Sequence, residues 1–404
     1  MELTEHLDLR GGSAPWAQGS QTLPSDALPT ARVDVAIIGT GIMGSMLADR
    51  LSEAGHRVAL LDRRPPAQGS TAASTALVMW EMDVSLSRLA ERIGEVEAVR
   101  RWRRVHETVV RLGLRIDREE IDAARIPRPV VLLAGTEMDE SGLADEGNLR
   151  RKHGLPSRMY APDAVAERFA IPPRAAIVSE DSYEVDPVRL TLSLLDRARR
   201  RGATLTYPVD VNQIVDTGSS IELRSQAGVV TAGHAILATG YERAREYLPR
   251  AFELTSSFAL ASSQGIAPLW NENAMLWEAS DPYLYARADS EGRILAGGED
   301  EKFQDASRRD ALIETKAKRI AERLERMIGG SRVRPECAWA ALFGGSPDGL
   351  PGIGLAAKEQ RLWLAAGFGG NGVSFAALAA ELLAAELAGR PDPDLKCFDP
   401  YRFD

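Results

Sequence analysis

VDVAIIGTGIMGSMLADRLSEAGHRVALLD, residues 33–62, reads as a strand, a glycine-rich turn, a helix and a second strand. Val35–Ile38 is a short apolar run with branched side chains, as expected of a buried parallel strand. The spacing G-x-G-x-x-G follows at Gly39, Gly41 and Gly44. In such a turn the glycines permit, in order, the tight bend, the close approach of a pyrophosphate and the close packing of the helix.

The end of this unit carries the second half of the signal. Arg57–Leu61 predicts the next strand, and Asp62 stands at its end, eighteen residues after Gly44. A carboxylate in that position can accept hydrogen bonds from a ribose. Strand, turn, helix, second strand and terminal acid together predict a dinucleotide-binding site, which the glycine pattern alone would indicate only weakly.

Composition excludes several other classes of protein. The 404 residues are 44% hydrophobic and carry a formal net charge of −9, which argues against a nucleic-acid partner. Two distant cysteines and five scattered histidines give no disulfide framework and no metal-ligand cluster, so we expect no metal. The first thirty residues contain no signal-peptide pattern, and no apolar run reaches the length of a membrane span. We therefore expect a cytoplasmic protein with no membrane partner.

A second glycine-rich loop lies near the C-terminus. Leu362–Ala366 predicts a strand, residues 367–372 (GFGGNG) follow it, and a helical pattern begins directly afterwards. A simple nicotinamide dehydrogenase has no need of this loop, whereas a flavoprotein with FAD extended across its sheet does.

The motifs in combination resemble the D-amino-acid oxidase, glycine oxidase and sarcosine oxidase superfamily of FAD-dependent oxidoreductases (the DAO family). The resemblance covers nearly the whole chain after Val33. Its carriers are residues 39–44 (GTGIMG) with Asp62, 69–76 (GSTAASTA), 238–240 (ATG), 347–354 (PDGLPGIG) and 367–376 (GFGGNGVSFA).

The resemblance implies an α/β fold, with a Rossmann-like FAD-binding domain and a discontinuous second α+β substrate domain built on a mixed sheet. We expect residues 1–32 to form an N-terminal arm. The FAD-binding domain is expected to comprise residues 33–84, 180–255 and 335–404. The substrate domain is expected to comprise residues 85–179 and 256–334.

The same resemblance, with the chemistry of the side chains, assigns the cofactor contacts. Backbone N–H groups and a helix N-terminus at the first loop would face the diphosphate, and the last loop would face the flavin pyrimidine ring. Asp62 would bind the adenosine ribose. The expected cofactor-binding residues are Gly39, Gly41, Ile42, Met43, Gly44, Asp62, Arg63, Thr71, Ser74, Thr75, Ala76, Val211, Thr239, Gly240, Gly344, Gly369, Gly370, Asn371, Gly372 and Val373.

One departure from the family bears on the substrate. Glycine oxidases carry an arginine that clamps the substrate carboxylate, and Phe343 stands in its place here. An arginine fork binds a carboxylate in a bidentate way, and phenylalanine cannot. Strand alternation puts Tyr283, Tyr285 and Arg287 on one face, so Arg287 is a candidate replacement. That face can equally be a half-exposed sheet surface.

Otherwise the substrate has no α-carboxylate, and Phe343 with Trp80 offers an apolar surface, although core packing is the more ordinary role for Trp80. The expected catalytic residues are thus Tyr285, Arg287 and Phe343.

The attachment of the flavin can also be predicted. The linking cysteine of sarcosine oxidase-like relatives would fall near Ala341, Cys337 lies upstream of that position, and residues 69–80 contain no histidine. We therefore expect noncovalent FAD.

The leading interpretation is an FAD-dependent enzyme that oxidises the C–N bond of a small-molecule amine or amino acid by hydride transfer to flavin N5. Oxidase and dehydrogenase both remain open, as do the electron acceptor and the oligomeric state. The alternatives are an FAD-dependent 2-hydroxy-acid dehydrogenase and a non-catalytic flavin-binding protein. A nicotinamide-dependent dehydrogenase is disfavoured by the C-terminal loop.

Overall fold

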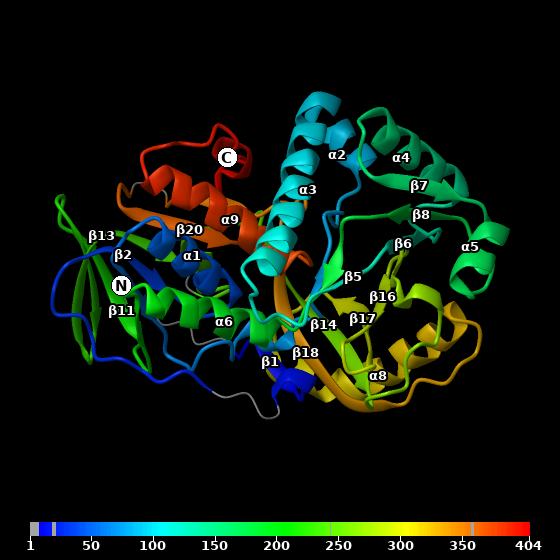
Figure 1. Cartoon of the computed structure of the whole chain (residues 1–404), viewed down its shortest axis with the longest axis horizontal. Coiled ribbons are helices and arrows are strands. Elements are labelled where there is room, and N and C mark those ends of the chain that lie inside the picture. Colours follow the sequence, from blue (N-terminus) through cyan, green and yellow to red (C-terminus); the bar gives the residue numbers. More distant parts are fainter. Residues whose placement is uncertain (1–7, 18–21, 243, 357–358) are drawn as a thin grey trace.

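The structure is a computed structural model that describes residues 8–17, 22–242, 244–356 and 359–404. Two large sheets form two lobes, and the long helix α3 (Glu95–Arg118) stands between them in the view of Figure 1. Parts of the expected N-terminal arm, residues 1–7 and 18–21, lie outside the described residues.

The first lobe contains an eight-stranded sheet. Its strands are β2 (Val33–Ile38), β3 (Val58–Leu61), β10 (Thr204–Thr206), β11 (Val211–Asp216), β12 (Ile221–Ser225), β13 (Gly228–Leu237), β19 (Gly352–Leu355) and β20 (Leu362–Ala366). Strands β10, β3, β2, β13 and β20 lie parallel in that order, while β11, β12 and β19 are antiparallel additions.

Both faces of this sheet are covered, which explains the apolar run of β2. Val35 and Ile37 belong to the core shared with α1 (Ile42–Glu53), α6 (Pro187–Arg200) and α9 (Gly372–Leu387). Ala36 and Ile38 belong to the opposite core, with side chains from β11 and β12. The alternation follows from the two-residue period of a strand.

The second lobe contains a nine-stranded mixed sheet. Its order is β1 (Arg10–Gly12), β18 (Pro335–Gly345), β14 (Glu253–Ser262), β17 (Ile294–Glu301), β16 (Leu284–Ala288), β15 (Met275–Glu278), β6 (Val130–Leu133), β8 (Ala176–Ser179) and β7 (Ser157–Tyr160). Only the β15–β6 pair is parallel among these described strands. Helix α8 (Ala306–Met327) packs against β14, β17 and β18 and buries Ile313, Ile320 and Leu324.

Shorter elements complete the described chain. They are α2 (Leu86–Ile93), α4 (Glu140–Lys152), α5 (Pro162–Phe169), α7 (Ala244–Tyr247), the small sheet of β4 (Leu77–Val78), β5 (Ile126–Pro127) and β9 (Tyr183–Glu184), and 3-10 helices at Pro15–Ala17, Ser70–Ala73, Asn271–Asn273 and Leu395–Phe398. None of the described helices has the length and apolarity needed to cross a membrane.

The strand pairing differs from the expected domain division in three places. The expected FAD-domain segment 335–404 begins with β18, which pairs with β14 in the nine-stranded sheet. The expected arm supplies β1, which pairs with β18. Helix α3, expected in the substrate domain, packs against α9 and joins the core of the first lobe. Long-range pairing of this kind has no signature in the local sequence pattern.

Candidate active site

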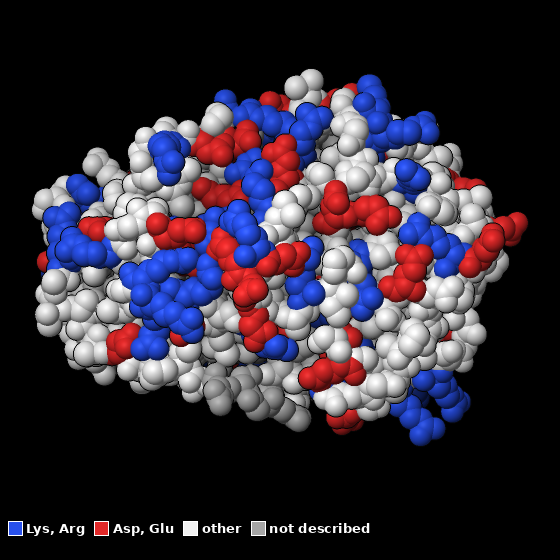
Figure 2. Space-filling model, viewed as in Figure 1, with Lys and Arg blue, Asp and Glu red and all other residues white. Residues whose placement is uncertain are grey.

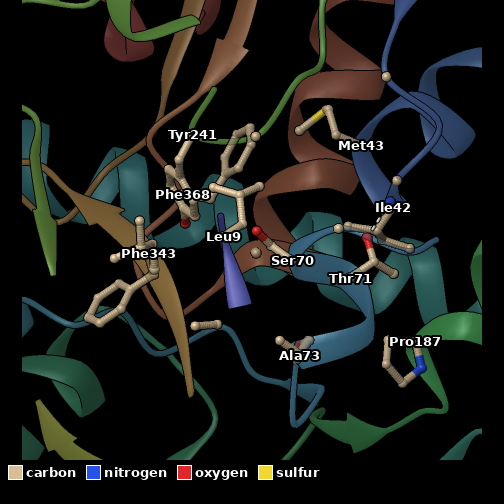
Figure 3. Close-up of a pocket in the computed structure, with 18 of the residues that line it drawn as sticks. Leu9, Ile42, Met43, Ser70, Thr71, Ala73, Pro187, Tyr241, Phe343 and Phe368 are labelled. Carbon is tan, nitrogen blue, oxygen red and sulfur yellow. Dashed lines mark hydrogen bonds between the residues drawn. The ribbon is translucent and has the colours of Figure 1, made fainter. Parts of the chain in front are cut away.

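An elongated cavity runs between the two sheets. One end is bounded by the turn after β2 and by Asp62, the middle by residues 67–77, and the other end by β16, β18 and the loop before α9. Figure 3 shows Ile42, Met43 and Thr71 on one side of this space and Tyr241, Phe343 and Phe368 on the other.

The glycine turn has the shape predicted for it. Gly39 has φ +117°, and a Cβ there would lie 2.3 Å from the Ala238 carbonyl oxygen. A Cβ on Gly44 would lie 1.9 Å from the Gly39 carbonyl oxygen, so Gly44 allows the helix to fold back against its own turn. Gly41 is the N-cap of α1 and has no side chain to cap it; the N–H of Ile42 donates to the Thr71 hydroxyl at 3.0 Å, and this helix start lines the cavity. Such a terminus favours an anion.

Asp62 also lies at the cavity, where its carboxylate anchors the turn. Its Oδ2 accepts hydrogen bonds from the backbone N–H of Thr40 at 2.7 Å and from the Thr40 hydroxyl at 2.9 Å. Its Oδ1 accepts from the N–H of Arg64 at 2.9 Å. A carboxylate has about four acceptor sites, so capacity remains for a ribose hydroxyl.

The basic side chains at this end are paired. Arg63 and Arg64 both donate to the carboxylate of the buried residue Glu242, Arg64 at 3.0 Å. Val211, Thr239 and Gly240 line the same end, as predicted from the family. Glu242 could not be predicted from the sequence, because nothing in its local pattern points toward the distant Arg63.

Residues 69–76 form the middle wall, and their backbone is held by three donors from distant elements. Trp339 Nε1 donates to the Ala73 carbonyl at 2.8 Å, and Trp16 Nε1 donates to that of Ser74 at 2.9 Å. Arg287 Nε donates to the Thr75 carbonyl at 2.5 Å. Three consecutive carbonyls are thus fixed from behind, while the wall presents Thr71, Ser74, Thr75 and Ala76 to the cavity.

This arrangement corrects the expectation for Arg287. Its side chain is 1% exposed and does not line the cavity. The guanidinium also donates to the carbonyls of Val185 and Ala288 and lies 3.4 Å from a Glu184 carboxylate oxygen. These bonds leave Arg287 behind the wall, where it cannot meet a substrate carboxylate. The alternative, a half-exposed sheet face, is also wrong for Arg287, which is buried. Tyr283 and Tyr285 have intermediate exposure, and both line the cavity.

The two tyrosines of the same strand do reach the cavity. Tyr283 and Tyr285 line it with rings stacked at 6.1 Å between centroids. Tyr285 fits because position 297 is glycine, where a Cβ would lie 2.1 Å from the tyrosine hydroxyl. Burial raises the pKa of Tyr285 to about 12, so its hydroxyl is protonated at neutral pH.

The last loop is fixed by backbone and side-chain hydrogen bonds. The N–H of Gly369 donates to the Gly344 carbonyl at 2.7 Å, and the N–H of Gly370 donates to Asp83 Oδ2 at 2.9 Å. Asn371 Nδ2 donates to the Glu81 carbonyl at 2.7 Å. Gly372 begins α9, and Val373 lines the cavity next to it. Gly344 itself lies behind the cavity lining and acts on this loop through its carbonyl.

Phe343 lines the cavity at the end opposite Ile42 (Figure 3). Trp80 does not join it. The Trp80 side chain is fully buried, donates to the Glu180 carbonyl at 2.7 Å and packs edge-on against Trp102. The packing role is therefore the correct interpretation of Trp80, and its proposed share in an apolar substrate surface is wrong.

Further residues complete this end of the cavity. The local sequence pattern did not predict the lining residues Leu9, Asp83, Tyr241, Ser257 and Trp277. One sequence feature could have indicated Asp83: it is an acidic residue that follows shortly after the small residues at positions 69–76. The described lining residues include no cysteine or histidine, and Cys337 lies in β18 opposite Ala261, away from the cavity.

Comparisons with known proteins agree with the geometry. A family model described as FAD dependent oxidoreductase, DAO, matches residues 34–386. The glycine oxidase of Bacillus licheniformis is 23% identical over 368 residues, covering 89% of this chain and 94% of the relative. The mitochondrial dimethylglycine dehydrogenase of Rattus norvegicus is 23% identical over 429 residues; the match covers 98% of this chain and 47% of that longer protein.

Solved structures confirm the predicted fold class. The glycine oxidase from Geobacillus kaustophilus superposes with a TM-score of 0.74 at 21% identity, covering 92% of this chain and 99% of the other. The L-amino acid deaminase from Proteus myxofaciens gives 0.75 at 16% identity, covering 98% of each chain.

Proposed function

The chain belongs to the DAO family of FAD-dependent oxidoreductases, and we propose that it oxidises the C–N bond of a small-molecule amine. FAD, when bound, supplies a two-electron acceptor for the hydride that leaves the carbon next to nitrogen. The protein's own residues hold the cofactor, hold the amine against it and exclude water. The single observation that carries the proposal is the continuous cavity, which joins the glycine turn to an aromatic chamber lined by β16 and β18.

The turn after β2 is proposed to hold the diphosphate of FAD. Support comes from Gly41, where a Cβ would lie 3.0 Å from the Thr71 hydroxyl, and from the start of α1, whose N-cap residue has no side chain and which lines the cavity. Asp62 is proposed to bind the ribose with its remaining acceptor capacity. Arg63, Val211, Thr239 and Gly240 would surround the adenosine half.

The flavin is proposed to lie between residues 74–76 and residues 369–373. The rigid backing of the first segment by Trp16, Trp339 and Arg287 supports this assignment, because a ring system is best oriented by a wall that does not move. The N-terminus of α9 faces the same space and would stabilise negative charge that develops on the ring during reduction.

Tyr285 and Phe343 are proposed to form the substrate side of the chamber, with Tyr283 beside them. The relatives are named for glycine and dimethylglycine, both of which carry nitrogen next to the oxidised carbon. The carboxylate of a 2-hydroxy acid, like that of an α-amino acid, needs a cation, and Arg287 is committed elsewhere. An amine without a carboxylate has no such need.

The test is to purify the protein, measure its flavin content and add amines, amino acids and 2-hydroxy acids anaerobically. We expect a yellow protein that releases FAD on denaturation and is bleached by compounds with an amine. A protein that neither contains nor takes up FAD would contradict the proposal, and so would bleaching by 2-hydroxy acids alone.

A further inference from the structure

The two ends of the cavity differ in charge. Among the described residues that line it, the basic ones are Arg63 and Arg64, both at the adenosine end and both paired with Glu242. The chamber end presents the carboxylate of Asp83 together with the aromatic side chains of Trp277, Tyr283, Tyr285 and Phe343. A carboxylated substrate would find no described cation there.

Asp83 is held in place and open to the cavity. Its Oδ2 accepts the Gly370 N–H at 2.9 Å, while its Oδ1 has no hydrogen-bond partner among the described residues. The side chain is exposed, and the space it faces is the cavity it lines. Although the side chain is open to the cavity, the protein packed around it desolvates the carboxylate and raises the pKa of Asp83 above its ordinary value.

A second carboxylate lies behind the cavity lining at the chamber end. Asp300 interacts with Tyr283 and Ser257, both of which line the cavity. Its Oδ1 is buried with no hydrogen-bond partner among the described residues. An unsatisfied buried acceptor is costly and is relieved by a nearby donor or cation.

From this geometry we infer that the substrate is a cationic amine without an α-carboxylate, and that Asp83 binds its ammonium group and accepts its proton. The inference rests on the proposed function and names the substrate class for that site. Aromatic faces attract an ammonium ion, so the four aromatic side chains of the chamber favour binding of a cation, as the Asp83 carboxylate does. A substrate carboxylate would instead be repelled by Asp83 and Asp300.

In the proposed reaction Asp83 takes a proton from the bound ammonium group. The N–H bond of the ammonium breaks, its proton forms an O–H bond on Asp83, and the nitrogen keeps the electron pair. The lone pair would then assist loss of hydride from the adjacent carbon, for which FAD, when bound, would be the two-electron acceptor; the iminium product would react with water to give a carbonyl compound and the protonated amine or ammonium. The raised pKa makes Asp83 a better proton acceptor than an ordinary aspartate.

The test measures ligand binding to the oxidised holoprotein, independently of turnover. Benzyltrimethylammonium is a quaternary cation with no lone pair, so it can bind without being oxidised; benzoate is the matched anion. Each is titrated while the flavin absorbance is followed. We expect the cation to bind and benzoate to bind at least tenfold more weakly.

Asp83→Asn keeps an oxygen that can accept the Gly370 N–H but removes the charge. We expect it to retain FAD and to weaken binding of the cation at least tenfold. Asp145→Asn, an exposed position on α4, makes the same change of charge away from the cavity and should leave binding unchanged.

Tighter binding of benzoate than of the cation by the unmodified protein would overturn the inference, even if Asp83→Asn failed to retain FAD. Undiminished cation binding in an FAD-loaded Asp83→Asn protein would also overturn it. If amino acids reduce the flavin and benzoate binds, the proposed function stands and only the inference fails. If no amine reduces the flavin, the proposed function fails, while the binding preference is still measured.

Discussion

At the scale of single residues, the site depends on side chains whose role is to hold backbone in place. Arg287 is the clearest case, since it joins three backbone carbonyls to Glu184 within a region that excludes water. A buried charge that loses its partner is strongly unfavourable. The residue therefore belongs to the support of the cavity wall.

We expect Arg287→Ala to lower the free energy of unfolding by about 3–5 kcal/mol, because it leaves Glu184 and three carbonyls without their donor. Chemical denaturation of the holoprotein measures this. The control is Arg200→Ala, whose exposed pair with Asp196 is expected to contribute about 0–1 kcal/mol. If Arg287→Ala raised KM and left the free energy of unfolding unchanged, the result would contradict this prediction and indicate that Arg287 binds substrate.

Asp300 provides a test by pH. Burial raises its pKa to about 6 in the folded chain, from a reference value of 3.8. Between these values the folded state binds more protons than the unfolded state, so the charged form costs stability as the pH rises through about 6. Asp300→Asn should therefore stabilise the protein more at pH 8 than at pH 4, by up to about 3 kcal/mol. Equal effects at both pH values would contradict the raised pKa.

Phe343→Arg tests the missing arginine directly. A guanidinium at the chamber end would supply the cation that a carboxylate needs. We expect the variant to bind benzoate at least tenfold more tightly than the unmodified protein does, with FAD retained. Unchanged benzoate affinity in the FAD-loaded variant would show that position 343 does not set the charge preference of the chamber.

At the scale of elements, the cofactor end depends on how tightly α1 meets the turn after β2. Gly44→Ala would put a Cβ 1.9 Å from the Gly39 carbonyl oxygen, so the helix start must move. We expect loss of at least 90% of bound FAD, read from absorbance after purification. Gly345→Ala is the matched control, because a Cβ there meets nothing within 4 Å. FAD content that is equal in the two variants would contradict the assignment of this turn to the cofactor.

Local sequence patterns predicted some elements of the site and could not predict others. The turn at Gly39 and the loop at Gly369 could be predicted because each lies in a continuous strand–loop–helix unit. The period of β16 correctly brought Tyr283 and Tyr285 to the cavity. It could not show that Arg287, two residues or roughly 6.6 Å further along, passes behind the wall. That depends on the path of residues 73–75, which local spacing does not specify.

At the scale of the whole molecule, contacts between distant parts of the chain complete the site. Leu9 comes from a segment expected to be an irregular arm, yet β1 pairs with β18 and brings it to the cavity. Helix α3 is fixed to the first lobe in the same way, since Arg104 donates to Glu381 of α9 at 2.8 Å and Arg115 to Asp49 of α1 at 2.5 Å. The two residues of each ion pair are more than sixty positions apart in the sequence, so no local motif predicts the pairing.

On the face shown in Figure 2, charged side chains of both signs lie side by side. Basic side chains gather over α6 on the face shown in Figure 2, with acidic side chains beside them. Arg197, Arg199 and Arg201 pair with Glu119, Asp26 and Asp49. This pairing is consistent with a solvated surface and with the small-molecule substrate proposed for the cavity.

The central claim is that the FAD-loaded protein oxidises an amine by removing hydride from the carbon next to its nitrogen. Anaerobic mixing of the FAD-loaded protein with benzylamine and with benzylamine deuterated at that carbon tests it most directly. We expect loss of the yellow colour with both, and more slowly with the deuterated compound because the C–H bond breaks as the flavin is reduced. Flavin that stays yellow with benzylamine and with every other amine would contradict the claim.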